Sequence, residues 1–378
     1  MSKENLKWLF ASIFVSANLL SYTMGNYDYN KIIYAISLIA IIIVVRKIVL
    51  TPSIIIFSGI TVAECFRSLY FWDYELTRSY TVYFLLFLIF SIFILSEKIN
   101  FFLFCKYQSY ILFVCLPIIY LSYTRQYDIG ILLGISYNIL PNYICNLMLI
   151  IINKYKIFSK NLYLFINVVL YGFFFLTKAN RGALLCIFIF ITLMYIFKSK
   201  NRLMKDMKLI IAFLCIVVCY FNFIDIVKSI KEVLNYLSID IYAIDKTIEL
   251  IINNKDIDSG RTFLINKMFD SIMDTHSFIW GRGIGFFENK FGIYVHNLFA
   301  QYFIEGGIFY VILPLVMVMY IVYKLFSKIK IERLISIFFI SAVVVPLLLS
   351  NVYWVIPLYW FCLIYVLSSF SKQVIITL

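Results

Sequence analysis

The sequence predicts an all-α, polytopic membrane protein, a bundle of about 12 transmembrane helices. Hydrophobic residues make up 63% of the 378 residues and charged residues only 14%, whereas soluble domains contain roughly 25% charged residues. Aromatic residues reach 19%, and many lie near the ends of apolar runs, as interfacial anchors do. We expect one integral membrane domain over residues 1–378 with one large extracytoplasmic loop.

Apolar runs follow one another along almost the whole chain. A spanning helix needs about 20 mainly apolar residues, and the second, fourth, seventh and eighth of the predicted spans are short by that standard. No cleavable signal peptide is evident in the first run. The predicted spans are 8–25, 29–45, 48–65, 80–95, 107–123, 129–152, 162–177, 182–197, 209–227, 295–323, 334–350 and 352–370.

The distribution of Lys and Arg predicts the orientation. With the N-terminus in the cytoplasm, 19 of the 33 basic residues lie in cytoplasmic segments and 6 in short outer segments. The other 8 lie in the loop 228–294, and long loops are largely exempt from the positive-inside rule. This bias predicts a plasma (inner) membrane protein with both termini cytoplasmic. It also explains the net charge of +13 without a nucleic-acid partner.

The loop 228–294 is the extracytoplasmic segment large enough to shape a site. Apolar and charged residues alternate at helical spacing over 225–252, which predicts two amphipathic helices on the membrane face. A third helix is predicted after Ser259, a suitable N-cap. Its apolar stripe consists of Leu264, Ile265, Met268, Phe269, Ile272 and Met273.

Three arginines on the predicted outer side are candidates for binding an anion. Arg181 begins the eighth span beside Asn180, so a capped helix N-terminus and a guanidinium together suit a phosphate or pyrophosphate; a lipid-headgroup anchor is the alternative. Arg261 and Arg282 add two cations. The glycines Gly281, Gly283 and Gly285 form either a nest of N–H groups for anionic oxygens or a flexible turn, and they are not a dinucleotide fingerprint.

His296 and Glu305 are the other candidate groups. A neutral imidazole at the outer interface can accept a proton from a sugar hydroxyl or orient it, although an interfacial His is often structural. Glu305 lies nine residues further on, on the opposite face of a regular helix, and needs a buried partner such as an arginine. Gly306 and Gly307 permit close approach of another helix.

Other motifs have plainer explanations. Asp256-Ile257-Asp258 resembles a metal-binding DxD, but it lies where nucleotide-sugars are not expected, and a capped loop explains it better. Asn138, Asn142 and Asn146 form a stripe that either joins helices by hydrogen bonds or lines a groove for a headgroup. The eight cysteines lie in apolar segments without CxxC spacing, which predicts buried free thiols.

Two separated motifs resemble the bacterial O-antigen polymerase and O-antigen ligase superfamily. They are Asn180-Arg181-Gly182-Ala183-Leu184-Leu185 and Trp280-Gly281-Arg282-Gly283-Ile284-Gly285, the latter followed by Val295-His296-Asn297-Leu298, Gln301 and Glu305-Gly306-Gly307. The similarity covers roughly residues 160–350. Asn180 stands where Ser commonly precedes the Arg-Gly pair, and Glu-Gly-Gly lacks the usual later glycine spacing.

The resemblance implies a metal-independent glycosyltransferase without a cofactor, acting on glycans carried by undecaprenyl diphosphate. The resemblance further implies that Arg181 and Arg261 hold the pyrophosphate and that His296 activates the acceptor hydroxyl. The further candidate substrate-binding residues are Arg282, Gly283, Gly285, Asn297 and Glu305.

Our hypothesis is a polymerase that joins repeat units of O-antigen or capsule on the outer face of the membrane, with a chain-length regulator protein as a candidate partner. The alternatives are a ligase that transfers glycan to the lipid A core, and a flippase or transporter of the lipid-linked unit. A transporter would be expected to show two related halves and polar residues near the midplane, and this sequence shows neither.

Overall fold

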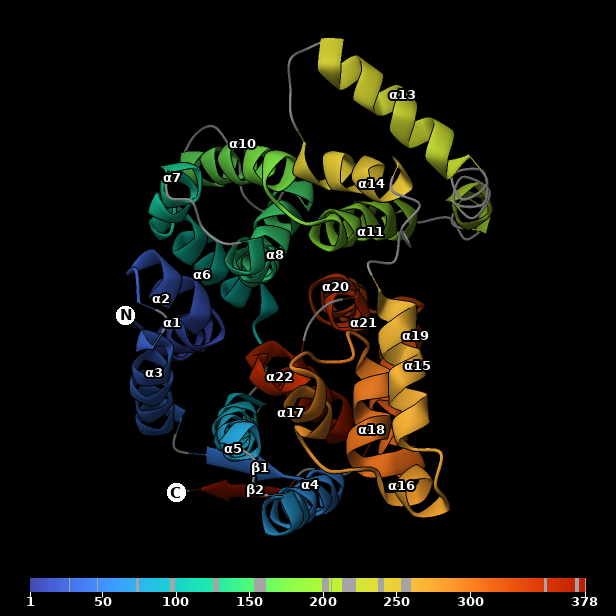
Figure 1. Ribbon diagram of the computed structural model, residues 1–378. Coiled ribbons are helices and arrows are strands. Elements are labelled where there is room, and N and C mark those ends of the chain that lie inside the picture. Colours follow the sequence, from blue (N-terminus) through green and yellow to red (C-terminus); the bar gives the residue numbers. More distant parts are fainter. Residues whose placement is uncertain are drawn as a thin grey trace.

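The protein is helical apart from one short antiparallel ribbon (Figure 1). The computed structural model describes the chain except residues 27, 46, 73–74, 96–98, 125–128, 153–160, 199–203, 205, 213–221, 237–240, 253–259, 350–351, 371–373 and 378. The elements up to residue 197 are α1 (Lys3–Val15), α2 (Ala17–Thr23), α3 (Tyr29–Val45), β1 (Lys47–Leu50), α4 (Pro52–Trp72), α5 (Glu75–Leu95), α6 (Phe101–Val114), α7 (Pro117–Thr124), α8 (Ile129–Ile151), α10 (Leu162–Thr177) and α11 (Arg181–Phe197).

The remaining elements form the predicted loop and the C-terminal part of the bundle. They are α13 (Phe223–Tyr236), α14 (Tyr242–Ile252), α15 (Arg261–Ser271), α16 (Thr275–Trp280), α17 (Phe286–Phe291), α18 (Leu298–Tyr310), α19 (Ile312–Leu325), α20 (Lys330–Phe339), the π-helical turn η1 (Ile340–Val344), α21 (Val345–Leu349), the 3-10 turn η2 (Tyr353–Val355), α22 (Pro357–Ser368) and β2 (Val374–Thr377).

Several predicted spans coincide with helices, and others are broken. The spans 29–45, 129–152, 162–177 and 182–197 match α3, α8, α10 and α11 within one residue. The predicted span 295–323 is not one continuous helix, because α18 and α19 meet at a bend of 104°. The run 107–123 is likewise two helices, α6 and α7, bent by 43°. The run 8–25 is interrupted at Ser16 between α1 and α2.

The described residues give fewer candidate spans, by helix length and composition, than the twelve that the sequence predicts. Four helices of the described part are long and apolar enough to cross a membrane, or up to six if each bent pair is one span. Shorter apolar helices are α3, α10, α11 and α22. The predicted span 209–227 lies largely outside the described residues. Twelve spans and the membrane orientation therefore stay predictions.

The ribbon pairs β1 with β2, so Lys47 lies opposite Thr377 and Leu50 opposite Val374. The predicted span 48–65 includes residues 48–50, but these residues belong to β1 and α4 begins only at Pro52. The ribbon joins the segment around residue 47 to the C-terminal end of the chain. The two segments share one side of the molecule, as a cytoplasmic position for both requires.

Buried amides connect the helices of the N-terminal half. Asn142 on α8 donates to Ser16 Oγ at 2.9 Å and to the Gln108 carbonyl at 3.2 Å. Asn167 on α10 donates to Asn146 Oδ1 at 3.1 Å. For Asn142 and Asn146, hydrogen bonds between helices therefore replace the alternative of a headgroup groove. The six described cysteines are buried and free, as predicted, while Cys215 and Cys219 lie outside the described residues.

The predicted loop contains α13 to α17. Amphipathic helices were predicted over 225–252, and α13 and α14 are there, with α14 packed against α10 (Figure 1). The third helix begins at Arg261, and its N-cap is Gly260, which supplies no side-chain hydrogen bond. Ser259, the predicted N-cap, and the motif 256–258 lie outside the described residues. Helices α15 and α16 pack against α18, which places the loop on the break in the bundle.

Candidate functional site

Arg181 occupies the start of α11, as predicted. Asn180 is the N-cap, and its side-chain oxygen accepts from the Ala183 N–H at 2.6 Å. The Arg181 side chain is partly buried, and its Nη1 donates to Thr247 Oγ1 on α14 at 3.3 Å. Helix α14 therefore orients the guanidinium at the end of α11, where the helix dipole also favours an anion.

Arg261 links the predicted residues electrostatically. It is the first residue of α15, and its positive charge acts both on the Arg181 guanidinium and on the His296 imidazole. Three residues from α11, α15 and the segment before α18 thus lie close enough for their charges to interact. Like charges this close repel each other, so the two arginines together favour an anion between them.

His296 has an unusual backbone and an unusual side-chain environment. Among the described residues it is the one non-glycine residue with a positive φ, 59°, a strained conformation that often occurs at functional sites. Burial and then the charge of Arg261 lower the pKa of its imidazole to about 4. The Nδ1 atom is buried without a hydrogen-bond partner, and the ring lies 4.0 Å from that of Tyr294, centroid to centroid. The imidazole is therefore neutral near pH 7.

Asn297 has a structural role that the substrate-binding prediction did not include. It is the N-cap of α18, and its Oδ1 accepts from the N–H groups of Phe299 at 3.0 Å and Ala300 at 3.2 Å. Because Asn and Asp are strong N-caps, the His-Asn pair both ends the loop and begins α18. His296 consequently precedes α18 and is not its first residue.

The glycine turn is a packing device, and the interpretation as an anion nest is wrong for its main donors. The N–H groups of Arg282 and Gly283 donate to the carbonyls of Ile304 and Glu305 at 2.6 and 2.9 Å. The Ile284 N–H donates to Ser68 Oγ at 2.9 Å. Gly283 and Gly285 have φ of 94° and 76° and are buried, which suits a tight turn against the bundle rather than contact with an anion.

Arg282 is engaged within the loop. Its Nη2 lies 2.5 Å from Asp274 Oδ2, and its Nε donates to the Ser271 carbonyl at 3.0 Å. Asp274 in turn caps α16 by accepting from the Ser277 N–H at 2.7 Å. Arg282 therefore joins the end of α15 to the start of α16, so its guanidinium already has an anionic partner and the prediction that it binds substrate gains no support here.

Glu305 lies at the break of α18. Gly307 adopts φ 74° and ψ −170°, so the helix is not regular there and the expected opposition of Glu305 to His296 does not apply. The carboxylate is completely buried, and its donors are Gln301 Nε2 at 2.6 Å, Trp354 Nε1 at 3.0 Å and the Tyr353 hydroxyl. These neutral donors replace the arginine that the sequence suggested. Within the described chain, Glu305 joins α18 to the segment around Tyr353 and Trp354, and its predicted part in substrate binding stays a prediction.

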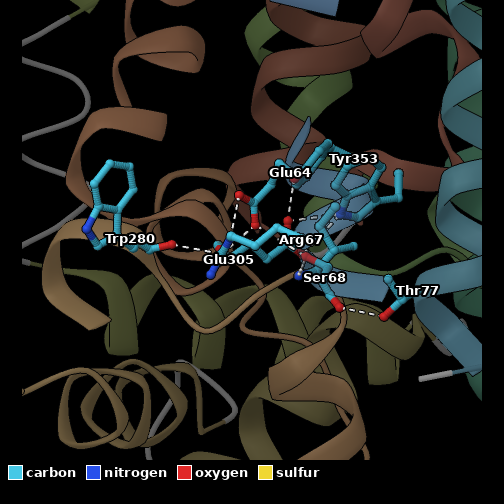
Figure 2. A network of polar contacts seen from close by, with 9 residues as sticks. Glu64, Arg67, Ser68, Thr77, Trp280, Glu305 and Tyr353 are labelled. Carbon is cyan, nitrogen blue, oxygen red and sulfur yellow. Dashed lines mark hydrogen bonds and ion pairs between the residues drawn. The ribbon is translucent and has the colours of Figure 1, made fainter. Parts of the chain in front are cut away.

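Sequence reasoning missed a polar network that holds the broken helix (Figure 2). Arg67 on α4 pairs with Glu64 at 2.5 Å and donates to the carbonyls of Trp280 at 2.8 Å and Glu305 at 3.1 Å. Thr77 on α5 donates to the Ile284 carbonyl at 2.7 Å. The signal available in the sequence was the charged pair Glu64 and Arg67 within an apolar run, because intramembrane charges seldom lack a partner.

Glu288 is a second residue that the sequence did not single out. It lies on α17, is 8% exposed and accepts from Gln301 Nε2 at 2.9 Å, so Gln301 bridges Glu288 and Glu305. Burial raises the pKa of Glu288 to about 7. Its Oε2 atom is buried without a hydrogen-bond partner. This carboxyl is thus partly protonated near neutral pH.

The comparisons with known proteins agree with the motifs. A family model described as O-antigen ligase matches residues 166–315, which contain Arg181, Arg261, His296 and Glu305. No curated protein and no solved structure gave a match. The apolar helices and this match together indicate a membrane protein. Residues 166–315 are therefore similar to the O-antigen ligase family, and this match supports the predicted resemblance to the O-antigen polymerase and ligase superfamily.

Proposed function

We propose that this protein is a glycosyltransferase that transfers a glycan from a lipid diphosphate carrier to a sugar hydroxyl, and that it polymerises repeat units. The observation that carries the proposal is the position of Arg261, whose charge acts on both Arg181 and His296. Two cations beside a neutral imidazole suit a diphosphate leaving group next to an acceptor hydroxyl. The match to the O-antigen ligase family supports the same chemistry.

The reaction needs one bond to form and one to break. The acceptor hydroxyl oxygen attacks the anomeric carbon of the donor glycan, and the bond from that carbon to the diphosphate oxygen breaks. The undecaprenyl diphosphate leaves with the bonding electron pair, and its developing charge is stabilised by Arg181 and Arg261. The hydroxyl proton passes to the imidazole of His296, which is available because it is neutral before the substrate binds.

The electrostatics of the site favour this order of events. Burial and then the charge of Arg261 lower the pKa of His296, since both disfavour the imidazolium. A bound diphosphate opposes the charge of Arg261 and thereby raises the pKa of His296. The imidazole becomes a stronger base once the donor is in place, when a base is required.

The ligase alternative rests on a specific observation, the description of the matching family, and shares every step above except the acceptor. The two are separated by reconstituting the purified protein in vesicles with a synthetic undecaprenyl-diphosphate oligosaccharide. A ladder of longer glycans with no other acceptor identifies a polymerase. Transfer that occurs only when lipid A core is added identifies a ligase. Movement of the lipid across the vesicle membrane without any new glycosidic bond would contradict both.

A further inference from the structure

A second cationic site lies at the other end of α11. A pocket of about 250 Å³ opens between the ends of α8 and α11 and the start of α20. Its apolar part includes Met194, Phe197 and Leu334, and its cations are Lys198, Lys330 and Arg333. These cations are among the basic residues that predict the orientation of the chain in the membrane, and none of them is a candidate for the reaction.

The charge of this pocket is not balanced from within. No carboxylate is among its described lining residues. The neighbouring carboxylate, Glu332, is occupied by Lys324 at 3.1 Å and by the Ser327 hydroxyl at 2.5 Å. Arg333 Nη1 donates a hydrogen bond to the Ser327 carbonyl at 3.0 Å. Because that acceptor is neutral, the bond does not cancel the positive charge of the guanidinium. Three cations therefore surround an apolar cavity.

The pocket is far from the proposed active site. Helix α11 begins at Arg181 and ends at Phe197, and 17 residues of α-helix extend about 25 Å. That length approaches the roughly 30 Å of a bilayer's hydrocarbon core. In the predicted topology, in which residues 182–197 span the membrane, the two ends of α11 lie at the two membrane faces. With the predicted orientation, the pocket is at the cytoplasmic face.

We propose that this pocket binds an anionic phospholipid, with the headgroup phosphate among Lys198, Lys330 and Arg333 and part of an acyl chain against Met194, Phe197 and Leu334. Basic pockets between helices on the cytoplasmic side are suited to such headgroups. A free phosphate would leave the apolar wall unused. The volume is slightly below the roughly 300–1,000 Å³ of ligand pockets, so the remainder of the lipid lies along the outer surface of the bundle.

The test is lipid retention by the full-length protein, measured by native mass spectrometry after exchange into detergent containing phosphatidylglycerol or phosphatidylcholine. We expect phosphatidylglycerol to be retained in preference. Lys198→Ala/Lys330→Ala should reduce its retention roughly 30-fold, whereas Lys198→Arg/Lys330→Arg should preserve it. The matched control is Lys3→Ala/Lys328→Ala, which removes two exposed lysines that do not line the pocket.

Four results would overturn the proposal. They are equal retention of the two lipids, an equal loss in the control, displacement of phosphatidylglycerol by millimolar inorganic phosphate, and stronger retention of undecaprenyl phosphate than of phosphatidylglycerol. Thermal unfolding of each variant shows that the lysines are removed from a folded protein. The measurement uses no glycan donor, so its outcome is independent of the glycosyltransferase proposal.

Discussion

Arg67 on α4 donates to the backbone carbonyl of Glu305 at 3.1 Å, across 238 positions of sequence. That carbonyl lies at the break of α18, where Gly307 leaves the helical conformation. The same carbonyl accepts from the Gly283 N–H at 2.9 Å. A carbonyl released by a helix break needs partners, and here an arginine and the glycine turn supply them. The break and the loop thereby stabilise each other.

Replacing Arg67 with Ala should destabilise the protein. The change leaves the Glu64 carboxylate unpaired and removes a donor from the carbonyls of Trp280 and Glu305. We expect a loss of about 1–3 kcal/mol, measured by thermal unfolding in detergent. Lys31→Ala, which removes an exposed pair with Asp28, serves as the control. An equal effect of the two substitutions would contradict the role given to Arg67.

Gly307→Ala should be far more harmful than a helical glycine substitution. Gly307 has a φ of 74°, and a Cβ there would collide with the Ile279 carbonyl. We expect the folded yield to fall sharply, with a cost of at least about 3 kcal/mol. Gly59→Ala on α4, where a Cβ meets nothing within 4 Å, should be neutral or stabilise by roughly 0.5–1 kcal/mol. A well-folded, fully active Gly307→Ala protein would show that the break is dispensable.

Arg181→Ala and Arg261→Ala should each lower kcat by about 10²–10³-fold, the usual effect of removing a donor to a developing negative charge. The measurement is initial-rate ladder formation in vesicles. The control for Arg261 is Lys267→Ala, which removes another cation of α15, one that lies over the Phe263 ring. A comparable loss of kcat in the Lys267 variant would show that any change of charge on α15 impairs the enzyme. It would contradict a specific role of Arg261.

The fall of activity at low pH should follow the protonation of His296. The pKa of His296 is about 4 in the free protein. The value of kcat/KM should therefore be constant near neutral pH and fall as pH drops through about 4, where the imidazole gains a proton. Arg261→Gln, measured on its residual activity, should move this fall to higher pH because it removes a neighbouring positive charge. A fall that does not move with the Arg261 charge would rule out His296 as its source.

His296→Asn separates the imidazole from the backbone strain. Asn tolerates a positive φ better than most residues, so the fold should persist while activity falls by about 10²–10⁴-fold, as for a lost general base. Ladder formation and thermal unfolding are measured on the same preparation. If the asparagine protein is as active as the parent, His296 is only a turn residue.

Glu288→Gln should change the dependence of stability on pH. Burial raises the pKa of Glu288 from 4.5 to about 7, so the folded protein keeps a proton that the unfolded chain has lost. The contribution of the Glu288 carboxyl to the free energy of unfolding is fully present below about pH 4.5 and is lost as pH rises through about 7. The glutamine variant should flatten this part of a plot of melting temperature against pH. An unchanged slope would show that another group causes it.

The sequence by itself determined the helical membrane class, the bounds of α3, α8, α10 and α11, and the motifs shared with the O-antigen ligase family. These follow from local properties, because an apolar run in a membrane must satisfy its backbone hydrogen bonds within itself and so favours helix. The caps at Asn180 and Asn297 are local in the same sense, since one side chain bonds to N–H groups two or three residues away.

Only the tertiary structure decided which polar groups meet. The sequence treated Arg282 and the glycine turn as parts of an anion site. In the fold, the turn's N–H groups bond to carbonyls of α18, and the Arg282 side chain joins the end of α15 to the start of α16. The sequence did not single out Arg67 or Glu288, because their partners are far away along the chain or on other helices. The approach of Arg261 to Arg181 and His296 is decided in the same way. Charge and hydrogen bonding act over a few ångströms in space, and only folding brings residues separated along the chain within that distance.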